Sequence, residues 1–354
     1  MQTVVGLMSG TSMDGIDAAL VRTDGLDRVE PLAFHFTPYD DGFRARLRAC
    51  LGGKGDVADV ERDLTEAHAA AVQALLAQAG VSAADVDLIG FHGHTILHAP
   101  HERRTWQIGN GALLAQRTGI TVVHDFRTAD VAAGGQGAPL VPLFHRALAS
   151  GLPRPLAVLN LGGVGNVTWI GEGEDDVIAC DTGPANALVD DWVLAKTGRR
   201  YDEGGQLARS GAVHALALTE LLDHPYFDRP APKSLDRDAF DAAPVRDLSP
   251  EDGAATLTAF TAFAVERVLP HLPQPPKRWL VTGGGRHNTT LMEMLRDRLR
   301  APVDPVESVG WDGDALEAQA FAYLAVRSRL GLPLSLPTTT GVPVPVTGGR
   351  CHSP

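Results

Sequence analysis

Residues 6–17, GLMSGTSMDGID, lie between two short apolar runs at residues 3–5 and 18–21. This pattern predicts a strand, a glycine-rich turn and a second strand. The three glycines allow positive φ angles and a close approach of the backbone to an anion, and the Ser and Thr hydroxyls add hydrogen-bond donors. Asp14 and Asp17 could hold a metal ion or its waters. The segment lacks the lysine and the following helix of a P-loop, so two alternatives stay open: a different phosphate-binding turn or an ordinary hairpin.

The bulk properties of the chain restrict its class. With 354 residues, of which 44% are hydrophobic, the chain is long enough for two domains with buried sheets. No apolar run approaches the roughly 20 residues of a membrane span, and no basic segment with a following apolar stretch stands at the start. Three widely separated cysteines argue against disulfides or a structural zinc site. The net charge of −12 argues against nucleic-acid binding, although backbone N–H groups can still bind phosphate. We therefore expect a cytoplasmic protein with no membrane and no nucleic-acid partner.

The layout of the first residues recurs in the second half of the chain. An apolar run at residues 156–161 is followed by Gly162, Gly163 and Gly165 and by another apolar run at residues 167–170. The recurrence is one of layout and not of residue identity, and it indicates a duplicated fold. These glycines superficially suggest a dinucleotide-binding fingerprint. That motif requires a helix where this sequence predicts a strand, which argues against a Rossmann site.

Other segments complete an α/β pattern. Residue spacing predicts helices at 59–78, 253–269, 289–300 and 314–329, and strands at 86–91, 121–124, 177–180 and 277–282. Two of these strands lead into polar residues, at 92–95 and at 125–127, and ligands bind at such strand ends in α/β sheets. We interpret residues 132–139 as a loop that could link two lobes.

Asp181 is the strongest single candidate for chemistry. It follows the predicted strand at 177–180 and precedes a turn through Gly183 and Pro184 into a helix that begins near Asn186. A carboxylate in this place is held by rigid elements and can act as a general base, which typically contributes about 10²–10⁴-fold in rate. Alternatively, Asp181 is a helix N-cap, which would stabilise the helix by about 1 kcal/mol. The local sequence supports both interpretations.

Two further groups are candidates for binding. Residues 283–285 are three glycines between a strand and a helix, so they form either a tight turn or a surface on which a base or ribose could lie. Arg127 could bind a substrate carboxylate bidentately, or it could form an internal ion pair with Asp125 or Asp130.

Four histidines are clustered in the sequence at His92, His94, His98 and His101. Ligands at this spacing could converge on a metal ion, but Pro100 and the flanking loop composition disfavour a preorganised site. Polar contacts to a substrate, or surface histidines, are the favoured interpretation.

Taken together, these segments resemble the anhydro-N-acetylmuramic acid kinases, a family in the superfamily of acetate and sugar kinases, Hsp70 and actin. The matching stretches follow one order along nearly the whole chain: 6–17, 91–95, 125–127, 134–142, 160–166, 181–186 (DTGPAN), 225–227, 233–234, 283–288 and 311–324. The opening motif together with DTGP is the most specific part of the resemblance.

The resemblance implies an ATP-dependent kinase of peptidoglycan recycling and amino-sugar catabolism. In such enzymes water opens the 1,6-anhydro bridge of the sugar at C1 while ATP phosphorylates O6, which gives N-acetylmuramic acid 6-phosphate and ADP. By analogy, Asp181 is the general base that takes a proton from the water. Mg²⁺ is implied together with ATP, and its protein ligands are left unassigned.

The resemblance also implies binding roles for other residues. The first turn would bind the ATP phosphates, the second turn would assist it, and the three glycines would line the adenosine. The residues in these roles are Gly10, Thr11, Ser12, Met13, Asp14, Gly15, Ile16 and Asp17, then Gly162, Gly163 and Asn166, then Gly283, Gly284 and Gly285. The residues that would face the anhydrosugar are His92, Thr95, Arg127 and Asp181. Arg127 is a candidate partner for its lactyl carboxylate.

We therefore predict an α/β protein of two lobes, each with a ribonuclease-H-like (actin-like) mixed sheet flanked by helices, and with the nucleotide in the cleft between the lobes. The N-terminal lobe would comprise residues 1–133, completed by the segment 330–354, and the C-terminal lobe residues 134–329. The expected partners are the sugar and ATP, and a homodimer is an option. The alternatives are a kinase of the same fold for another sugar, or a non-catalytic actin-like regulator that depends on a nucleotide.

The chain departs from the family pattern at three places. Relatives usually carry Gln at the position of His94 and Gly at that of Ala185, and the common Lys-Ser-Thr-Gly stretch is Lys-Ser-Leu-Asp at residues 233–236 here. None of these changes removes a residue that the chemistry requires. The last one leaves the role of that loop open.

Overall fold

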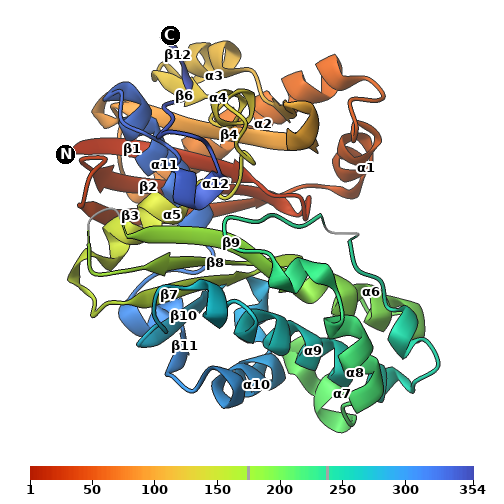
Figure 1. Cartoon of the computed structure of the whole chain (residues 1–354). Coiled ribbons are helices and arrows are strands. Elements are labelled where there is room, and N and C mark those ends of the chain that lie inside the picture. The colour runs from red at the N-terminus through yellow and green to blue at the C-terminus, as the bar shows by residue number, and fades with distance from the viewer. Residues whose placement is uncertain (174–175, 237–238) are drawn as a thin grey trace. The chain divides into compact units, whose positions relative to one another are not determined.

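The computed structural model describes residues 1–173, 176–236 and 239–354, and the chain divides into two compact units (Figure 1). Unit 1 comprises residues 1–151 and 314–354, and unit 2 comprises residues 152–313. Each unit has its own mixed sheet with helices packed against it. The predicted α/β fold with one mixed sheet per lobe is confirmed.

Unit 1 is built on a sheet in the order β12-β6-β4-β1-β2-β3, with β5 paired to β4. The strands are β1 (Gln2–Ser9), β2 (Gly15–Thr23), β3 (Val29–Pro38), β4 (Leu88–Ala99), β5 (Arg104–Ile108), β6 (Val122–His124) and β12 (Arg350–His352). The helices are α1 (Asp41–Ala49), α2 (Val57–Ala79), α3 (Gly111–Thr118), α4 (Thr128–Ala132), α5 (Pro142–Leu148), α11 (Leu316–Arg329) and α12 (Pro337–Thr340). Strands β1, β4 and β6 are parallel to one another, whereas β2 and β12 are antiparallel to their neighbours.

Unit 2 is built on a sheet in the order β11-β10-β7-β8-β9. The strands are β7 (Leu156–Leu161), β8 (Val164–Ile170), β9 (Val177–Pro184), β10 (Arg278–Thr282) and β11 (Val303–Pro305). The helices are α6 (Asn186–Thr197), α7 (Gln206–Ser210), α8 (Ala215–Leu222), α9 (Pro250–Glu266) and α10 (Thr289–Leu299). Strands β7, β10 and β11 are parallel, and β8 is antiparallel to both of its neighbours.

The two sheets repeat one topology. The order β6-β4-β1-β2-β3 of unit 1 matches the order β11-β10-β7-β8-β9 of unit 2, with the same sequence of parallel and antiparallel pairs. The duplicated layout predicted from residues 156–170 is therefore confirmed. In both units the carboxyl ends of the parallel strands meet at one edge of the sheet, where polar loops can converge.

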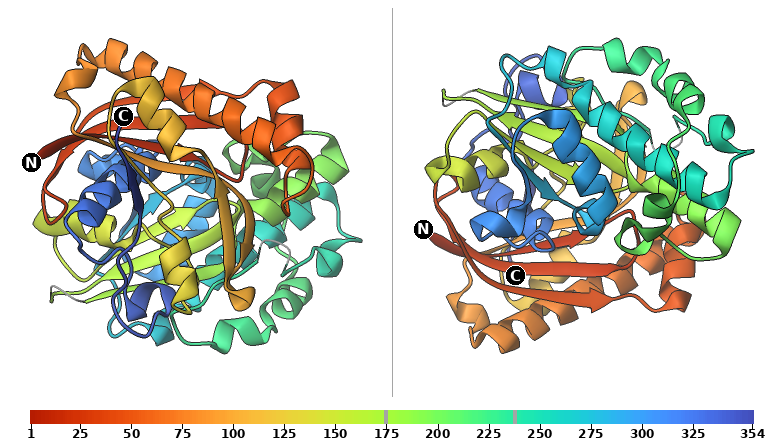
Figure 2. Two further views of the ribbon diagram at one scale, coloured as in Figure 1. Left: turned by 90° about the horizontal axis from the view of Figure 1, so that it is seen from above. Right: turned by 90° about the horizontal axis from the view of Figure 1, so that it is seen from below.

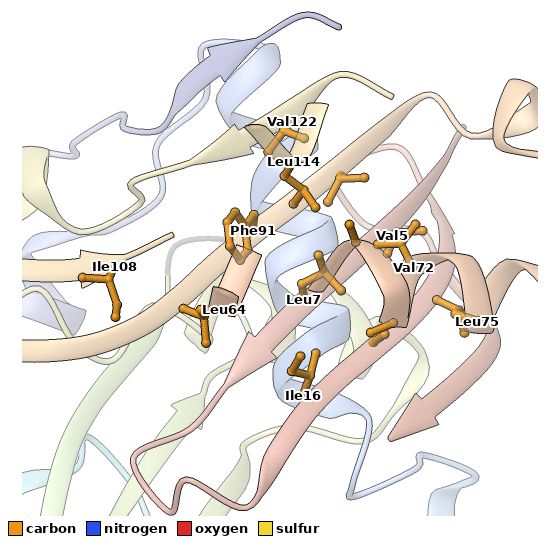
Figure 3. Packing of buried hydrophobic residues seen from close by; sticks show 14 of the residues in the cluster. Val5, Leu7, Ile16, Leu64, Val72, Leu75, Phe91, Ile108, Leu114 and Val122 are labelled. Atoms are coloured by element: carbon orange, nitrogen blue, oxygen red, sulfur yellow. The ribbon is translucent and has the colours of Figure 1, made fainter. Parts of the chain in front are cut away.

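One face of the unit 1 sheet forms a large apolar core with α2. Val5 and Leu7 of β1 and Ile16 of β2 belong to one buried cluster with Leu64 and Val72 of α2 (Figure 3). The apolar residues whose spacing predicted a helix at residues 59–78 thus face this core. The helix is capped at its C-terminus by Gly80, which has a φ of +66°. Figure 2 shows α2, in orange, lying across the red strands β1–β3.

The other face of that sheet packs against α11, and the two backbones approach closely at two glycines. A Cβ atom on Gly6 would lie 1.8 Å from the carbonyl oxygen of Ala318, and one on Gly90 would lie 2.0 Å from that of Phe321. Successive strand residues face opposite sides of a sheet, so Gly6 lies on the face away from α2. Glycine at these two positions allows the helix backbone to approach the strands closely.

The division of the chain differs from the expected lobes. Residues 134–151 and 314–329, which we expected in the second lobe, belong to unit 1. The reason is packing: α11 contacts β1, β2 and β4, and α5 contacts α11. The loop at residues 132–139 therefore does not link the units, because the chain crosses between them at residues 151–152 and 313–314. Within the described ranges, no helix combines the length and apolar character that crossing a membrane requires.

Candidate active site

The glycine-rich turn between β1 and β2 is an ordered hairpin turn, as the sequence predicted. The Met13 N–H donates to the Gly10 carbonyl at 3.0 Å, and Met13 has a φ of +55°, which few residues other than glycine adopt. The Met13 carbonyl accepts a 2.9 Å hydrogen bond from Nε of Arg44 in α1. The Ser12 hydroxyl donates to Oδ1 of Asp14 at 2.6 Å. These bonds hold the turn in one conformation.

Only part of the predicted phosphate-binding run is accessible. The side chains of Thr11, Ser12 and Asp14 are exposed. Ile16 is completely buried in the core of unit 1, and Met13 is 6% exposed. Ile16 and Met13 could therefore meet a ligand only through their backbone groups.

His92 in β4 and Arg127, which follows β6, form a hydrogen-bonded pair. Arg127 Nε donates to His92 Nε2 at 3.0 Å, and His92 Nδ1 lies 2.9 Å from the Gly93 carbonyl oxygen. A carbonyl only accepts hydrogen bonds, so the His92 proton is on Nδ1 and the ring is neutral. Burial and the neighbouring guanidinium hold the pKa of His92 well below its ordinary value. The structure brings these two predicted residues together.

Arg127 is a half-buried cation that the structure leaves available for an anion. Its Nη1 donates to the Gly137 carbonyl at 2.6 Å, and burial lowers its pKa to about 10, so it stays charged at neutral pH. These two hydrogen bonds engage Nε and one of the two protons on Nη1. A bidentate contact to a carboxylate would therefore use the second Nη1 proton and Nη2.

The alternative of an internal ion pair of Arg127 with Asp125 or Asp130 is excluded, because both acids bind elsewhere. Asp125 Oδ2 lies 2.9 Å from Nε of Arg350 in β12. Asp130 accepts hydrogen bonds from the Gly137 N–H and from the Thr340 hydroxyl, both at 2.6 Å. Asp130 therefore fixes the glycine-rich loop that also contacts Arg127.

Glu317 is a candidate that the sequence did not single out. It is an exposed residue in the first turn of α11, and its charge interacts electrostatically with Arg127 and Asp14. Acidic residues are common in the first turn of helices because they stabilise the N-terminus. A glutamate at this position therefore did not indicate a functional residue.

His94 and Thr95 are adjacent in β4 but differ in accessibility. His94 is completely buried, and its Nδ1 lies 3.0 Å from the Ser9 hydroxyl, which also accepts a 2.8 Å bond from the Tyr39 hydroxyl. Burial lowers the pKa of His94 to about 4. Thr95 is half-buried, and its hydroxyl accepts a 3.1 Å bond from Gln107. His94 thus anchors the end of β1, whereas Thr95 is the more accessible of the two.

The remaining clustered histidines do not point to a metal site. His98 Nδ1 lies 3.0 Å from the Thr105 hydroxyl, and His101 lies 3.6 Å from the Glu102 carboxylate. In the part of the chain that the structure describes, no three His, Cys, Asp or Glu side chains gather as metal ligands. Both side chains are exposed, which agrees with surface histidines, one of the two interpretations that the sequence favoured.

Asp181 of unit 2 lies inside a strand. β9 continues past the predicted end because Asp181 pairs with Asn166 of β8. The N-cap residue of α6 is Ala185, without a side-chain capping bond, so the N-cap alternative for Asp181 is excluded. Oδ2 of Asp181 accepts a 2.7 Å hydrogen bond from the Leu235 N–H.

The environment of Asp181 suits a general base. Burial raises its pKa to about 7, the charge of Asp236 adds to the rise, and the Leu235 N–H opposes it. A base whose pKa lies near the working pH combines an adequate ionised fraction with adequate basicity. Strongly perturbed carboxyl groups of this kind are typical of functional sites.

Asp181 ends a polar row across the sheet of unit 2. Thr282 of β10 pairs with Asn160 of β7, Asn160 pairs with Asn166 of β8, and Asn166 pairs with Asp181 of β9. Residues opposite one another on neighbouring strands share a face, and the adjacent apolar residues of these strands belong to the core on the other face. Asn160 and Thr282 are therefore further candidate site residues. In the sequence, only their position at the ends of predicted strands could have indicated this.

The second glycine-rich turn lies at the same edge. Gly162 and Gly163 connect β7 to β8, and no helix follows them, so the argument against a Rossmann site is confirmed. The Asn186 and Ala185 N–H groups at the start of α6 donate to the Gly162 and Gly163 carbonyls at 2.9 and 3.0 Å. Asn166 is half-buried and Gly163 is exposed.

The three glycines after β10 are explained first by packing. Gly283 has a φ of +74°, and a Cβ atom there would lie 2.3 Å from Oδ1 of Asn160. A Cβ atom on Gly285 would lie 2.6 Å from Cβ of Leu161, whereas Gly284 has more room. The tight-turn interpretation is therefore correct for this segment.

Residues 2–353 match the sequence model of a family described as anhydro-N-acetylmuramic acid kinase. The chain belongs to the anhydro-N-acetylmuramic acid kinase family. Two relatives of that name, from Rhodospirillum rubrum and Paramagnetospirillum magneticum, are each 61% identical to it. The aligned residues cover 98% and 99% of this chain, and 92% and 99% of the two relatives. As a member of this family the chain is an enzyme, a kinase.

A solved structure supports the fold independently. Component A of (R)-2-hydroxyglutaryl-CoA dehydratase from Acidaminococcus fermentans superposes with a TM-score of 0.51 at 12% identity, over 93% of this chain and 100% of that one. At this identity the likeness concerns the fold alone.

This member of the anhydro-N-acetylmuramic acid kinase family has Leu235 and Asp236 in place of the Thr-Gly of the family pattern. The Leu235 N–H still donates to the Asp181 carboxylate, and Asp236 adds a negative charge near it.

Proposed function

We propose that this kinase converts 1,6-anhydro-N-acetylmuramic acid, water and ATP into N-acetylmuramic acid 6-phosphate and ADP, a step in the recycling of cell-wall peptidoglycan. The observation that carries the proposal is the carboxyl group of Asp181, fixed in the edge strand β9 by its pairing with β8 and raised in pKa to about 7 by burial. The names of the relatives that are 61% identical support the choice of substrate.

In the proposed reaction Asp181 accepts a proton from a water molecule as the water oxygen attacks C1 of the sugar. The bond from C1 to O6 breaks, the new hydroxyl stays on C1, and O6 takes the γ-phosphoryl group of ATP as ADP leaves. The Leu235 N–H engages Oδ2 of Asp181, which leaves Oδ1 for the water. A general base in this position contributes about 10²–10⁴-fold in rate.

Arg127, His92 and Thr95 would bind the sugar. The Arg127 guanidinium is charged and half-buried, so a ligand carboxylate such as the lactyl group would compensate it. His92 orients the guanidinium through its Nε2 atom. The half-buried hydroxyl of Thr95 could bind a sugar hydroxyl.

The two glycine-rich turns would bind ATP. In unit 1 the exposed side chains of Thr11, Ser12 and Asp14 and the backbone of residues 10–17 would meet the phosphates. In unit 2 we assign Gly162, Gly163 and Asn166 to the phosphates and residues 283–285 to the adenosine.

Mg²⁺ fits these residues as a companion of ATP. When bound, the ion would neutralise charge on the phosphate oxygens. Proteins usually hold Mg²⁺ through one or two carboxylates together with phosphates and water. The exposed carboxylate of Asp14, with Oδ1 engaged by Ser12 and Gly15, could supply Oδ2 for this purpose. We place the reaction in the cytoplasm, where ATP is available.

The proposal is tested by supplying the pure protein with 1,6-anhydro-N-acetylmuramic acid, ATP and Mg²⁺ and following the products by mass spectrometry. We expect a product heavier than the sugar by one water and one phosphoryl group, and ADP that forms only when the sugar is present. Phosphorylation of N-acetylglucosamine but not of the anhydrosugar would instead indicate a kinase for another sugar. Nucleotide binding without turnover of any sugar would indicate a regulator.

A further inference from the structure

Lys233 is a buried cation without an assigned role. It is 4% exposed, and its Nζ donates to the carbonyl oxygens of Tyr226 at 3.1 Å and Phe227 at 3.4 Å. The ammonium also lies 4.5 Å from the centroid of the Tyr226 ring. Its described hydrogen bonds thus go to neutral groups, and burial lowers its pKa. Removing a charge from water is costly, so this arrangement calls for a reason.

The backbone around Lys233 is bonded to Asp181 on both sides. The Asp181 N–H donates to the Lys233 carbonyl at 2.9 Å, and two residues later the Leu235 N–H donates to the Asp181 carboxylate at 2.7 Å. The Tyr226 hydroxyl donates to the Asp181 carbonyl at 2.7 Å. The Lys233 side chain closes this ring of bonds, because it fastens its own segment to the turn at Pro225–Asp228.

We infer that Lys233 is a positioning residue for Asp181: its ammonium clamps residues 233–235 onto the turn at Pro225–Asp228, so that the Leu235 N–H holds and orients the carboxylate. The inference rests on the proposed role of Asp181 as general base. It also gives a role to the loop at residues 233–236, in which this chain departs from its relatives. The clamp uses the lysine side chain and backbone groups, so it survives the change to Leu235 and Asp236.

Loss of the clamp should change the pH dependence of turnover. The charged and titratable groups around Asp181 are Asp236, Cys180, Tyr226 and Lys233 itself. Of these, Asp236 raises the pKa of Asp181, and the Leu235 N–H is the group that lowers it. If the clamp is lost, that N–H bond weakens and the pKa of Asp181 rises. The acid limb of the rate profile, where the base becomes protonated, then moves to higher pH.

The test compares Lys233→Met with Lys233→Arg and with Lys196→Met in the full-length enzyme. Lys196 is a matched control in the same unit, because its Nζ also donates to a carbonyl, that of Arg246 at 2.9 Å, and lies 4.4 Å from the Trp192 ring, but it is exposed and has no described bond to the Asp181 segment. For Lys233→Met we expect kcat to fall about tenfold and the acid limb to rise by about half a pH unit, with KM for ATP within about twofold. Lys233→Arg keeps the hydrogen-bond donors and the positive charge, so its kcat and its acid limb should lie closer to those of the unchanged enzyme. Lys196→Met should change neither kcat nor the acid limb.

Unchanged kcat and an unchanged acid limb in a folded Lys233→Met variant would overturn the inference. Should that variant unfold at the assay temperature, Lys233→Leu, which also lacks a donor, is measured together with Lys233→Met at a lower temperature and judged by the same two readouts. Asp181→Asn separates this inference from the proposed function. Normal turnover in Asp181→Asn refutes the role of the base, whereas inactive Asp181→Asn with normal Lys233→Met refutes only the clamp.

Discussion

At the scale of single residues, the candidate residues of each unit include ionisable groups whose surroundings set their charge. Asp181 shows this most clearly, since burial and Asp236 push its pKa up and one backbone N–H pulls it down. Burial has the opposite effect on the pKa of His92: together with the charge of Arg127 it lowers this pKa and keeps the ring neutral. Both states follow from desolvation, which disfavours whichever form carries the charge.

Turnover should therefore fall as the pH drops through about 7, the pKa to which Asp181 is raised, because only its ionised form can accept a proton. Removing the Asp236 charge with Asp236→Asn should move this acid limb of kcat/KM to lower pH, by up to about one unit. Steady-state kinetics between pH 5 and 9 measure both profiles. An acid limb that stays in place in Asp236→Asn would contradict the assigned cause of the shift.

At the scale of elements, each unit offers a hairpin turn that ends a parallel strand, and each turn is fixed by a helix. Arg44 of α1 binds the turn after β1, and the first N–H groups of α6 bind the turn after β7. The glycines serve packing as well as turning: Gly283 lies against Asn160, and Gly6 lies against α11. A glycine run therefore indicates a close approach of backbones before it indicates a ligand.

Arg44→Met should raise KM for ATP several-fold, because the Met13 carbonyl and the turn lose their fixing hydrogen bond. Nη2 of Arg44 also donates to the carbonyl of Tyr39 at 3.2 Å, and the Tyr39 N–H donates to the Asp14 carbonyl at 2.9 Å, so the variant weakens a second link to the turn. Arg46→Met is the control, since Arg46 lies on the same helix but forms an exposed ion pair with Asp63. Equal KM values for ATP in the two variants would show that Arg44 does not position the turn.

Gly6→Ala should lower the free energy of unfolding by about 1–3 kcal/mol or more, because the new methyl group would overlap the backbone of α11. Gly151→Ala is the control, because a Cβ atom there would have no neighbour within 4 Å among the described residues. Urea unfolding monitored by circular dichroism compares the two. A Gly6→Ala protein as stable as Gly151→Ala would mean that β1 and α11 are less closely packed than described.

At the scale of the whole molecule, buried neutral histidines couple stability to pH. His68 and His94 have pKa values lowered to about 4 and His145 to about 3, in each case by burial. An unfolded chain binds protons on these rings near pH 6.5, whereas the folded chain does not. Their contribution is therefore fully present above pH 6.5 and is lost as the pH falls toward 4.

The melting temperature should accordingly be lower at pH 5.5 than at pH 7.5, with each such histidine costing up to about 1.4 kcal/mol per pH unit. Asp181 and Glu317 act in the opposite direction, since a carboxyl of raised pKa binds its proton more readily in the folded state, but the histidines of lowered pKa, which also include His92 and His124, outnumber them. Differential scanning calorimetry measures the change. His68→Gln should reduce the drop and His101→Gln, on an exposed histidine, should not; an equal or higher melting temperature at pH 5.5 would contradict this account.

The sequence predicted the regular elements and the duplicated plan well, because apolar periodicity directly reflects burial. The helix at residues 59–78, the strand at 277–282 and the turn after residue 161 all appear where their patterns indicated. It predicted the limits of β4 and β9 less well. Polar residues at His92 and Asp181 interrupt the apolar pattern although the backbone pairing continues through them.

By itself the sequence determined the family, the fold class and the candidate base, because these depend on local patterns and motifs in a fixed order. Only the tertiary structure decided which unit α11 completes, that Asp125 and Asp130 bind elsewhere than Arg127, and that Lys233 is tied to Asp181. Each of these depends on contacts between residues far apart in the chain, such as Gly6 with Ala318 and Asp130 with Thr340. Such contacts are set by packing and by the hydrogen bonds that buried groups must find, and local sequence carries no record of them.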